Sequence, residues 1–126
     1  MNQRTPRILL AFSSFLLIVG AAMHASAFPK TLAAANASNL PFFFAAALKM
    51  LWLADSTTLC LVGIAFAWIA GSPSSATRPI VVLLALIPGA TAVLIYLFLG
   101  TFFAAHLLLV VALMGIVAAL WFSAGD

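Results

Sequence analysis

The sequence predicts an all-α integral membrane protein, an antiparallel bundle of four transmembrane helices that forms one domain over residues 1–126. Composition is the first reason, because 67% of the residues are hydrophobic and 6% are charged. Soluble domains are about half apolar and about a quarter charged. The second reason is the pattern, in which four apolar runs of about bilayer length alternate with short polar segments. Disorder is excluded by the abundance of Leu, Phe, Ile and Val.

The first apolar run covers residues 8–27 and follows a polar head with two arginines. Twenty helical residues span about 30 Å, the thickness of the hydrocarbon core. Residues 1–27 also have the basic start, apolar centre and A-x-A end (Ala25–Ala27) of a cleavable signal peptide. We expect the segment to be retained, because Ser13 and Ser14 interrupt the apolar centre and cleavage would leave three spans.

The second helix is predicted over residues 41–70, before a Gly-Ser-Pro stop. Residues 28–39 contain Pro, Lys, Asn and Ser and are predicted to form a loop with at most a short helical turn. Ser38 or Asn39 can cap the second helix, and Pro41 suits its first turn. Thirty residues reach about 45 Å, more than one bilayer core needs, so tilt or an interfacial start must absorb the excess.

The third and fourth helices are predicted over residues 80–99 and 102–122, joined by a hairpin turn. Residues 72–79 form the tight polar loop before them. Pro88 and Gly89 are expected to kink the third helix, because a proline inside a helix removes one backbone hydrogen bond.

The basic residues predict the orientation. If the N terminus is inside, the cytoplasmic segments hold Arg4, Arg7 and Arg78, and the opposite side holds Lys30 and Lys49. The positive-inside rule then places both termini in the cytoplasm. The short length and high alanine content of the chain favour a bacterial inner (plasma) membrane.

Threading the four helices through a bilayer brings most polar side chains to one depth, near the outer leaflet. The inner half offers only hydroxyls. Ionisable groups in hydrocarbon cost roughly 3 kcal/mol or more, so they should face other helices or water. The candidates for this polar layer are Asp55, Lys49, His24, Tyr96 and Ser56, with His106 as a weaker one. A polar layer in one leaflet is what a shallow cavity open to the outside would need.

Lys49 and Asp55 are six residues apart, about 120° around a helix, so they do not form an i, i+4 pair. Lys49 can extend to the membrane surface. Asp55 is short and must be hydrogen-bonded, paired or protonated. One hypothesis makes it a proton- or cation-binding carboxylate with His24 or Tyr96 as partner. The other makes it a structural clamp, bonded to Trp52, Ser56 or a backbone group of a neighbouring helix.

Small residues mark faces on which helices can approach closely, within one chain or between copies. Ser56 shares such a face of the second helix, with Asp55 at its flank. His106 lies off the small-residue ridge of the fourth helix, so we expect it to meet a second contact or the membrane interface. The small-residue motifs are Gly63-x-x-x-Ala67, Ala85-x-x-x-Gly89 and Gly115-x-x-x-Ala119.

No cofactor and no metal site are predicted. His24 and His106 could ligate a haem or a metal between the first and fourth helices, but interfacial histidines need no such role and the position of His106 weighs against it. Cys60 is the single cysteine, which excludes an internal disulfide, a CxxC pair and a thiolate zinc cluster. Tyr96 and the three tryptophans, Trp52 among them, are expected in interfacial belts.

The sequence lacks the motifs that several classes of enzyme require. There is no G-x-S-x-G, H-E-x-x-H or P-loop sequence and no pair of membrane carboxylates, so an enzyme is not favoured. The net charge of +3 is not gathered into a basic patch, so no nucleic-acid partner is predicted. In size and span count the chain is similar to small multidrug resistance transporters. The acidic residue that those proteins carry in their first helix has no counterpart between Ile8 and Ala27.

Two functional hypotheses follow. The first is a non-catalytic accessory subunit or oligomeric scaffold, which would bind a second copy or a larger membrane partner within the lipid bilayer. The alternative is a small transporter or a proton/cation pathway that uses Asp55.

Overall fold

The structure, a computed structural model, describes residues 4–122 and is all-helical over that range. Three segments in it are long and apolar enough to cross a membrane, namely Arg4–Ala37, Phe42–Gly71 and Arg78–Leu99. The helices are α1 (Arg4–Ser26), α2 (Phe28–Ala37), α3 (Phe42–Gly71), the 3-10 helix η1 (Pro73–Ser75), α4 (Arg78–Leu99) and α5 (Phe103–Ala119). The predicted all-α class is confirmed. The crossing of a membrane by α5, which has 17 residues, stays a prediction.

Residues 28–37 are helical, so the loop predicted there is wrong. Pro29 suits the first turn of a helix, and the alanine-rich sequence after it has high helix propensity. Only Ala27 separates α2 from α1. Lys49 Nζ donates to Asn36 Oδ1 over 2.7 Å, so polar side chains that suggested a loop instead join α2 to α3.

The predicted caps of α3 are also wrong. Pro41 occupies the N-cap position without a side-chain hydrogen bond, and Ser38 Oγ donates backward to the Ala35 carbonyl at the end of α2. At the other end of the chain, α5 ends at Ala119 rather than at residue 122. The carbonyls released there, including that of Phe122, accept hydrogen bonds from the Arg78 guanidinium.

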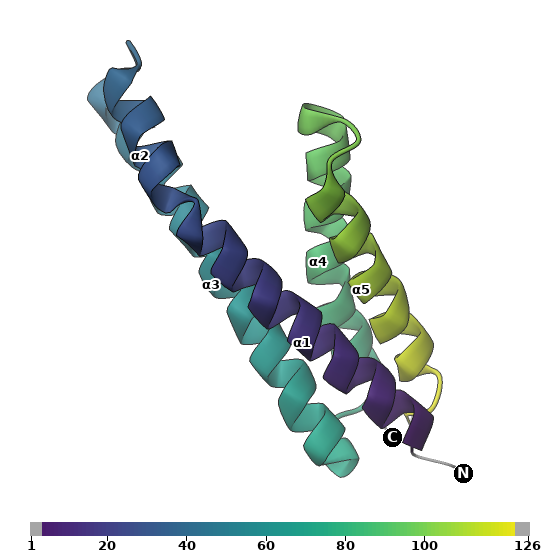
Figure 1. The fold of residues 1–126 in the computed structure, drawn as a ribbon. Coiled ribbons are helices and arrows are strands. Elements are labelled where there is room, and N and C mark those ends of the chain that lie inside the picture. The colour runs from purple at the N-terminus through teal and green to yellow at the C-terminus, as the bar shows by residue number, and fades with distance from the viewer. Residues whose placement is uncertain (1–3, 123–126) are drawn as a thin grey trace.

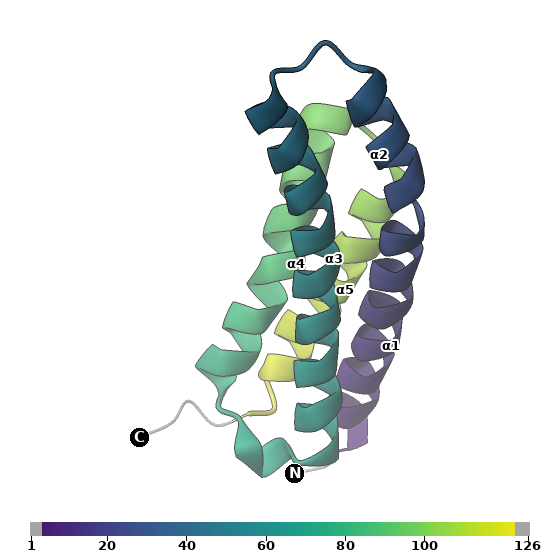
Figure 2. The same cartoon turned by 90° about the vertical axis from the view of Figure 1, so that its left-hand side faces the viewer.

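The long helices form two hairpins, one of α1, α2 and α3 and the other of α4 and α5 (Figure 1). Figure 2 shows α1 and α3 running alongside each other, and these two helices share the most extensive packing. α1 also packs on α5, whereas α3 and α4 share few contacts. The four long helices are therefore packed in the order α3–α1–α5–α4, and α3 and α4, the first and last of this order, touch only sparsely.

The half of the molecule that contains Arg4, Arg7 and Arg78, the arginine half, is closely packed. Phe66 is fully buried there. A Cβ on Gly115 would lie 2.7 Å from Ala85 Cβ and 3.2 Å from Phe66 Cζ, and one on Gly63 would lie 2.9 Å from Ile18 Cγ1. The small residues thus bring helices together within one chain.

The opposite half, which contains His24, Lys30 and Asp55, is the open half. The two hairpins diverge toward it (Figure 1). α4 passes through Pro88 without interruption on its way there. The helix is not interrupted at Pro88, because a proline removes only one backbone hydrogen bond from a long helix and Pro88 is buried against its neighbours. The predicted kink stays a prediction.

Candidate functional site

The open half holds a cavity of about 580 Å³ between the two hairpins, which we name the cleft. Its walls come from α1, α3, α4 and α5. Leucine, isoleucine and phenylalanine side chains make up most of the lining. The polar or partly polar side chains that line it are His24, Trp52, Asp55 and Thr91.

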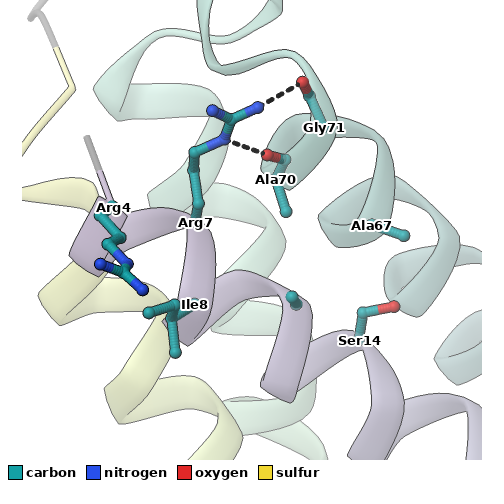
Figure 3. A pocket seen from close by; sticks show the side chains of 8 residues that line it. Arg4, Arg7, Ile8, Ser14, Ala67, Ala70 and Gly71 are labelled. Atoms are coloured by element: carbon teal, nitrogen blue, oxygen red, sulfur yellow. Dashed lines mark hydrogen bonds between the residues drawn. The ribbon is translucent and has the colours of Figure 1, made fainter.

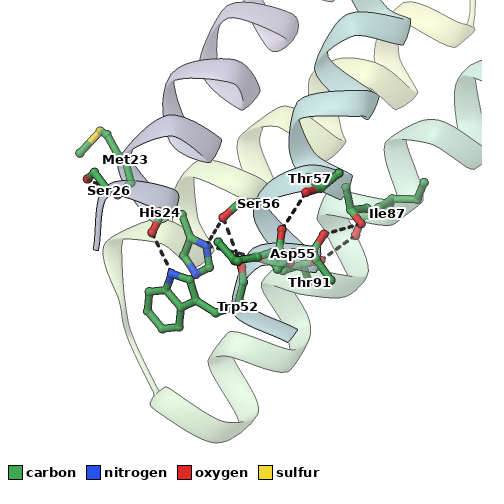
Figure 4. Close-up of polar contacts among 12 residues, drawn as sticks. Met23, His24, Ser26, Trp52, Asp55, Ser56, Thr57, Ile87 and Thr91 are labelled. Carbon is green, nitrogen blue, oxygen red and sulfur yellow. Dashed lines mark hydrogen bonds and ion pairs between the residues drawn. The ribbon is translucent and has the colours of Figure 1, made fainter. Parts of the chain in front are cut away.

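His24, near the end of α1, is held by two residues of α3 (Figure 4). Its ring stacks on Trp52 with centroids 4.1 Å apart, and Trp52 Nε1 donates to the His24 carbonyl over 2.9 Å. His24 Nδ1 lies 2.8 Å from Ser56 Oγ, which itself lies 3.2 Å from the Trp52 carbonyl. A serine has one hydroxyl proton, so if Ser56 donates it to that carbonyl, Oγ accepts from Nδ1–H of His24.

Asp55 lies next to this group but is not part of its hydrogen bonds. Its Oδ2 is 3.9 Å from His24 Nδ1, too far for a hydrogen bond. Thr91, which also lines the cleft, donates its hydroxyl to the Ile87 carbonyl instead. Within residues 4–122 the Asp55 carboxylate receives no hydrogen bond, and its side chain is 37% exposed.

This arrangement leaves the Asp55 carboxyl group on an apolar wall, with no hydrogen-bond donor among the described residues. A carboxylate at membrane depth is costly unless a charge or donor compensates it. His24 is close enough to contribute electrostatically, but Ser56 takes its nearer ring nitrogen. The carboxyl oxygens of Asp55 are therefore available as hydrogen-bond acceptors toward the cleft.

The other predicted polar residues lie apart from this group. Lys49 is bound to Asn36. Tyr96 packs edge-on against His106, with ring centroids 5.4 Å apart, rather than against Asp55. His106 is exposed, and its Nδ1 lies 3.0 Å from the Phe102 carbonyl of its own helix. Of the predicted polar layer, the structure brings together His24, Asp55 and Ser56.

Sequence reasoning assigned Trp52 to an interfacial belt and named it as a possible partner of Asp55, but it missed the stacking of Trp52 on His24. The spacing of Trp52 and Ser56, four residues apart on one helical face, could have indicated it. Phe98 and Phe103, which also line the cleft, carried no usable signal. Their convergence depends on how far the hairpins diverge.

Among residues 4–122, no three of His, Cys, Asp and Glu lie close enough to hold a metal ion. Comparisons with models of known protein families, with curated proteins and with solved structures find no match. A proposal about function therefore rests on the geometry of the cleft.

Proposed function

We propose that this protein is a small multi-pass membrane protein that binds a monovalent organic cation in the cleft and acts as a transporter or cation pathway. One observation carries the proposal: the Asp55 carboxylate lines an apolar cavity and receives no hydrogen bond from the described part of the chain. His24 Nδ1, 3.9 Å away, carries a charge only when it is protonated, whereas a cation that enters the cleft would bring a permanent positive charge to Asp55. Asp55 is then the counter-ion, and the contact between His24 and Ser56 holds the adjacent wall of the cleft in place.

The lining favours an organic cation over a small metal ion. Ca²⁺ binds six to eight oxygens, and Mg²⁺ keeps a near-octahedral set of them. The cleft offers one carboxylate among leucine, isoleucine and phenylalanine side chains. A ligand with an apolar body can bury that body against these walls. The faces of Trp52, Phe98 and Phe103 can add cation–π attraction.

A proton pathway has less support. Such a pathway needs polar groups that continue through the membrane, and Tyr96, one predicted partner, contacts His106 instead of Asp55. Beyond the cleft, Phe66, Leu17 and Leu10 are fully buried in the arginine half.

We place the arginine half on the cytoplasmic side of a bacterial inner (plasma) membrane, with four spans and both termini inside. Arg4 and Arg78 lie at the starts of α1 and α4, and Arg7 bonds the end of α3. Lys30 lies in α2, and Lys49 bonds Asn36 of α2, so the two sets of cations are separated along the helices, which supports this orientation under the positive-inside rule. The cleft then opens toward the outside.

A second candidate function is an accessory subunit or oligomeric scaffold. The few contacts between α3 and α4 favour it, because they leave the cleft between the two hairpins accessible to a further helix. In that case a partner helix or a second copy, rather than a small cation, would lie against Asp55.

Binding of tetraphenylphosphonium to the purified full-length protein, measured by titration calorimetry, tests the first proposal. Tetraphenylborate has the same shape and the opposite charge, so it controls for apolar partition into the micelle. We expect the phosphonium to bind and Asp55→Asn to weaken it at least tenfold, about 1.4 kcal/mol. Asp55→Glu keeps the charge and should retain most of the affinity.

Equal affinity of wild type and Asp55→Asn would contradict the proposal. If Asp55→Asn leaves binding unchanged but dissociates oligomers or a co-purifying membrane protein, the scaffold function is favoured. Uptake of the phosphonium into reconstituted vesicles separates transport from binding alone.

A further inference from the structure

The arginine half contains a second cavity, which is lined by residues of α1 and α3 and shares no lining residue with the cleft (Figure 3). Its volume is about 580 Å³, and it lies between the first turns of α1 and the last turn of α3. Arg4 and Arg7 line one end. Ile8, Ala11, Ser14 and Ala67 line the rest. We name it the arginine groove.

We propose that the arginine groove binds a phospholipid with a net-negative headgroup, with the phosphate at Arg4 and Arg7 and part of one acyl chain along α1. The inference is independent of the function proposed for the cleft. It concerns the leaflet next to the arginine half.

The dimensions of the groove fit one leaflet. From Arg4 to Ser14 the helix rises ten residues, about 15 Å, which is half of the roughly 30 Å hydrocarbon core. Along that rise the lining changes from cationic to apolar, because Ile8 is 58% exposed and Ala11 and Ala67 are exposed as well. A phospholipid has the same order of charge and apolar chain.

Arg7 is held in a position that suits phosphate binding. Its Nε donates to the Ala70 carbonyl over 2.8 Å and its Nη2 to the Gly71 carbonyl over 3.0 Å, which fixes the guanidinium at the end of α3 (Figure 3). A guanidinium has five N–H donors, so three remain. Arginine and phosphate form charge-assisted, often bidentate hydrogen bonds.

The charge of Arg7 has no carboxylate partner within residues 4–122. Asp55, the acidic residue of that range, lies in the open half next to His24. Within residues 4–122, the arginine half thus contributes no carboxylate to pair with Arg7. A lipid phosphate supplies an anion, and the apolar part of the groove accommodates a hydrocarbon chain.

Native mass spectrometry of the full-length protein, titrated with phosphatidylglycerol or phosphatidylcholine in mild detergent, tests the inference. We expect phosphatidylglycerol to bind at least tenfold more tightly. Arg7→Gln should weaken it about fivefold, and Arg4→Gln by a similar factor.

Arg78→Gln is the matched control. It removes one positive charge from the same half, and like Arg7→Gln it removes hydrogen bonds to a helix end. Arg78 does not line the groove. We expect its lipid affinity to match that of wild type. An equal loss in Arg78→Gln would overturn the inference in favour of a general charge effect.

Ala67→Phe keeps every charge and fills the apolar part of the groove. We expect it to weaken phosphatidylglycerol at least fivefold, and we expect millimolar inorganic phosphate not to displace the lipid from wild type. Unchanged affinity in Ala67→Phe, or displacement by phosphate, would show that a phosphate group alone is bound and would overturn the lipid assignment. Equal binding of both lipids, or a dimer that excludes lipid, would do the same.

Discussion

The arginine half and the open half are built from the same helices, yet one is closely packed and the other holds a cavity. In the arginine half, glycines and alanines face each other, and Gly115 admits no Cβ without displacing Ala85 or Phe66. In the open half a Cβ on Gly20 would meet only Leu107, at 3.9 Å. Close packing thus follows the small residues, and the space left where they stop contains Asp55.

The largest difference between the halves should appear in Phe66→Ala. Phe66 is fully buried where the two hairpins meet, and we expect its truncation to lower the free energy of unfolding by about 3 kcal/mol. Phe98→Ala is the control, because Phe98 is 81% exposed in the open half and should change it by less than about 0.5 kcal/mol. Unfolding by denaturing detergent measures both. Similar losses would show that the halves do not differ in packing.

A pair of glycine substitutions sharpens the comparison. Gly115→Ala forces a methyl group into Ala85 and should destabilise the protein by about 1–3 kcal/mol. Gly20→Ala has room and gains helix propensity, so it should be neutral or stabilising by up to about 1 kcal/mol. The same unfolding assay reports both values. Opposite signs are expected, and a tolerated Gly115→Ala would be inconsistent with the close approach of α4 and α5.

A smaller loss of stability is expected when a hydrogen bond between α1 and α3 is removed from the open half. Ser56→Ala removes the hydroxyl between His24 and the Trp52 carbonyl and should cost about 1 kcal/mol of unfolding free energy. Thr57→Val removes a neighbouring hydroxyl that bonds only its own helix, so its cost should be below about 0.5 kcal/mol. If both variants unfold alike, the His24–Ser56 contact does not contribute to stability.

The smallest effect is predicted for His106→Ala. His106 is exposed and contacts Tyr96 edge-on, so its loss should cost about 0.5 kcal/mol. Its replacement should also leave the affinity for tetraphenylphosphonium unchanged, because His106 does not line the cleft. A tenfold loss of affinity in calorimetry would require His106 to be added to the site.

Much of the fold could be predicted from the sequence because membrane helices are determined by length and apolarity. α3 and α4 begin and end within two residues of their predicted bounds. α2 was missed because Pro29, Lys30 and Asn36 suggest a loop, and the partner of Asn36 cannot be read from the sequence. The side-chain oxygen of Asn36 accepts a hydrogen bond from Lys49, a residue too distant in the sequence to be recognised as its partner.

The site was only partly predictable for a similar reason. Helical phase and depth bring His24, Asp55 and Ser56 to one level, and the structure places them together. Depth alone cannot separate neighbours on different faces, so it also selected Tyr96 and His106, which contact each other. The cleft was not predictable in size or lining, because both depend on the angle between the hairpins.

The most direct test of the account is whether water reaches position 55 from the side opposite the arginines. Asp55→Cys in a Cys60→Ser background carries one cysteine and can be labelled with a membrane-impermeant maleimide in sealed, oriented vesicles. Lys30→Cys and Arg78→Cys in the same background mark the two sides. We predict that position 55 is labelled from the side of position 30. An unreactive position 55, or labelling from the side of position 78, would contradict the account.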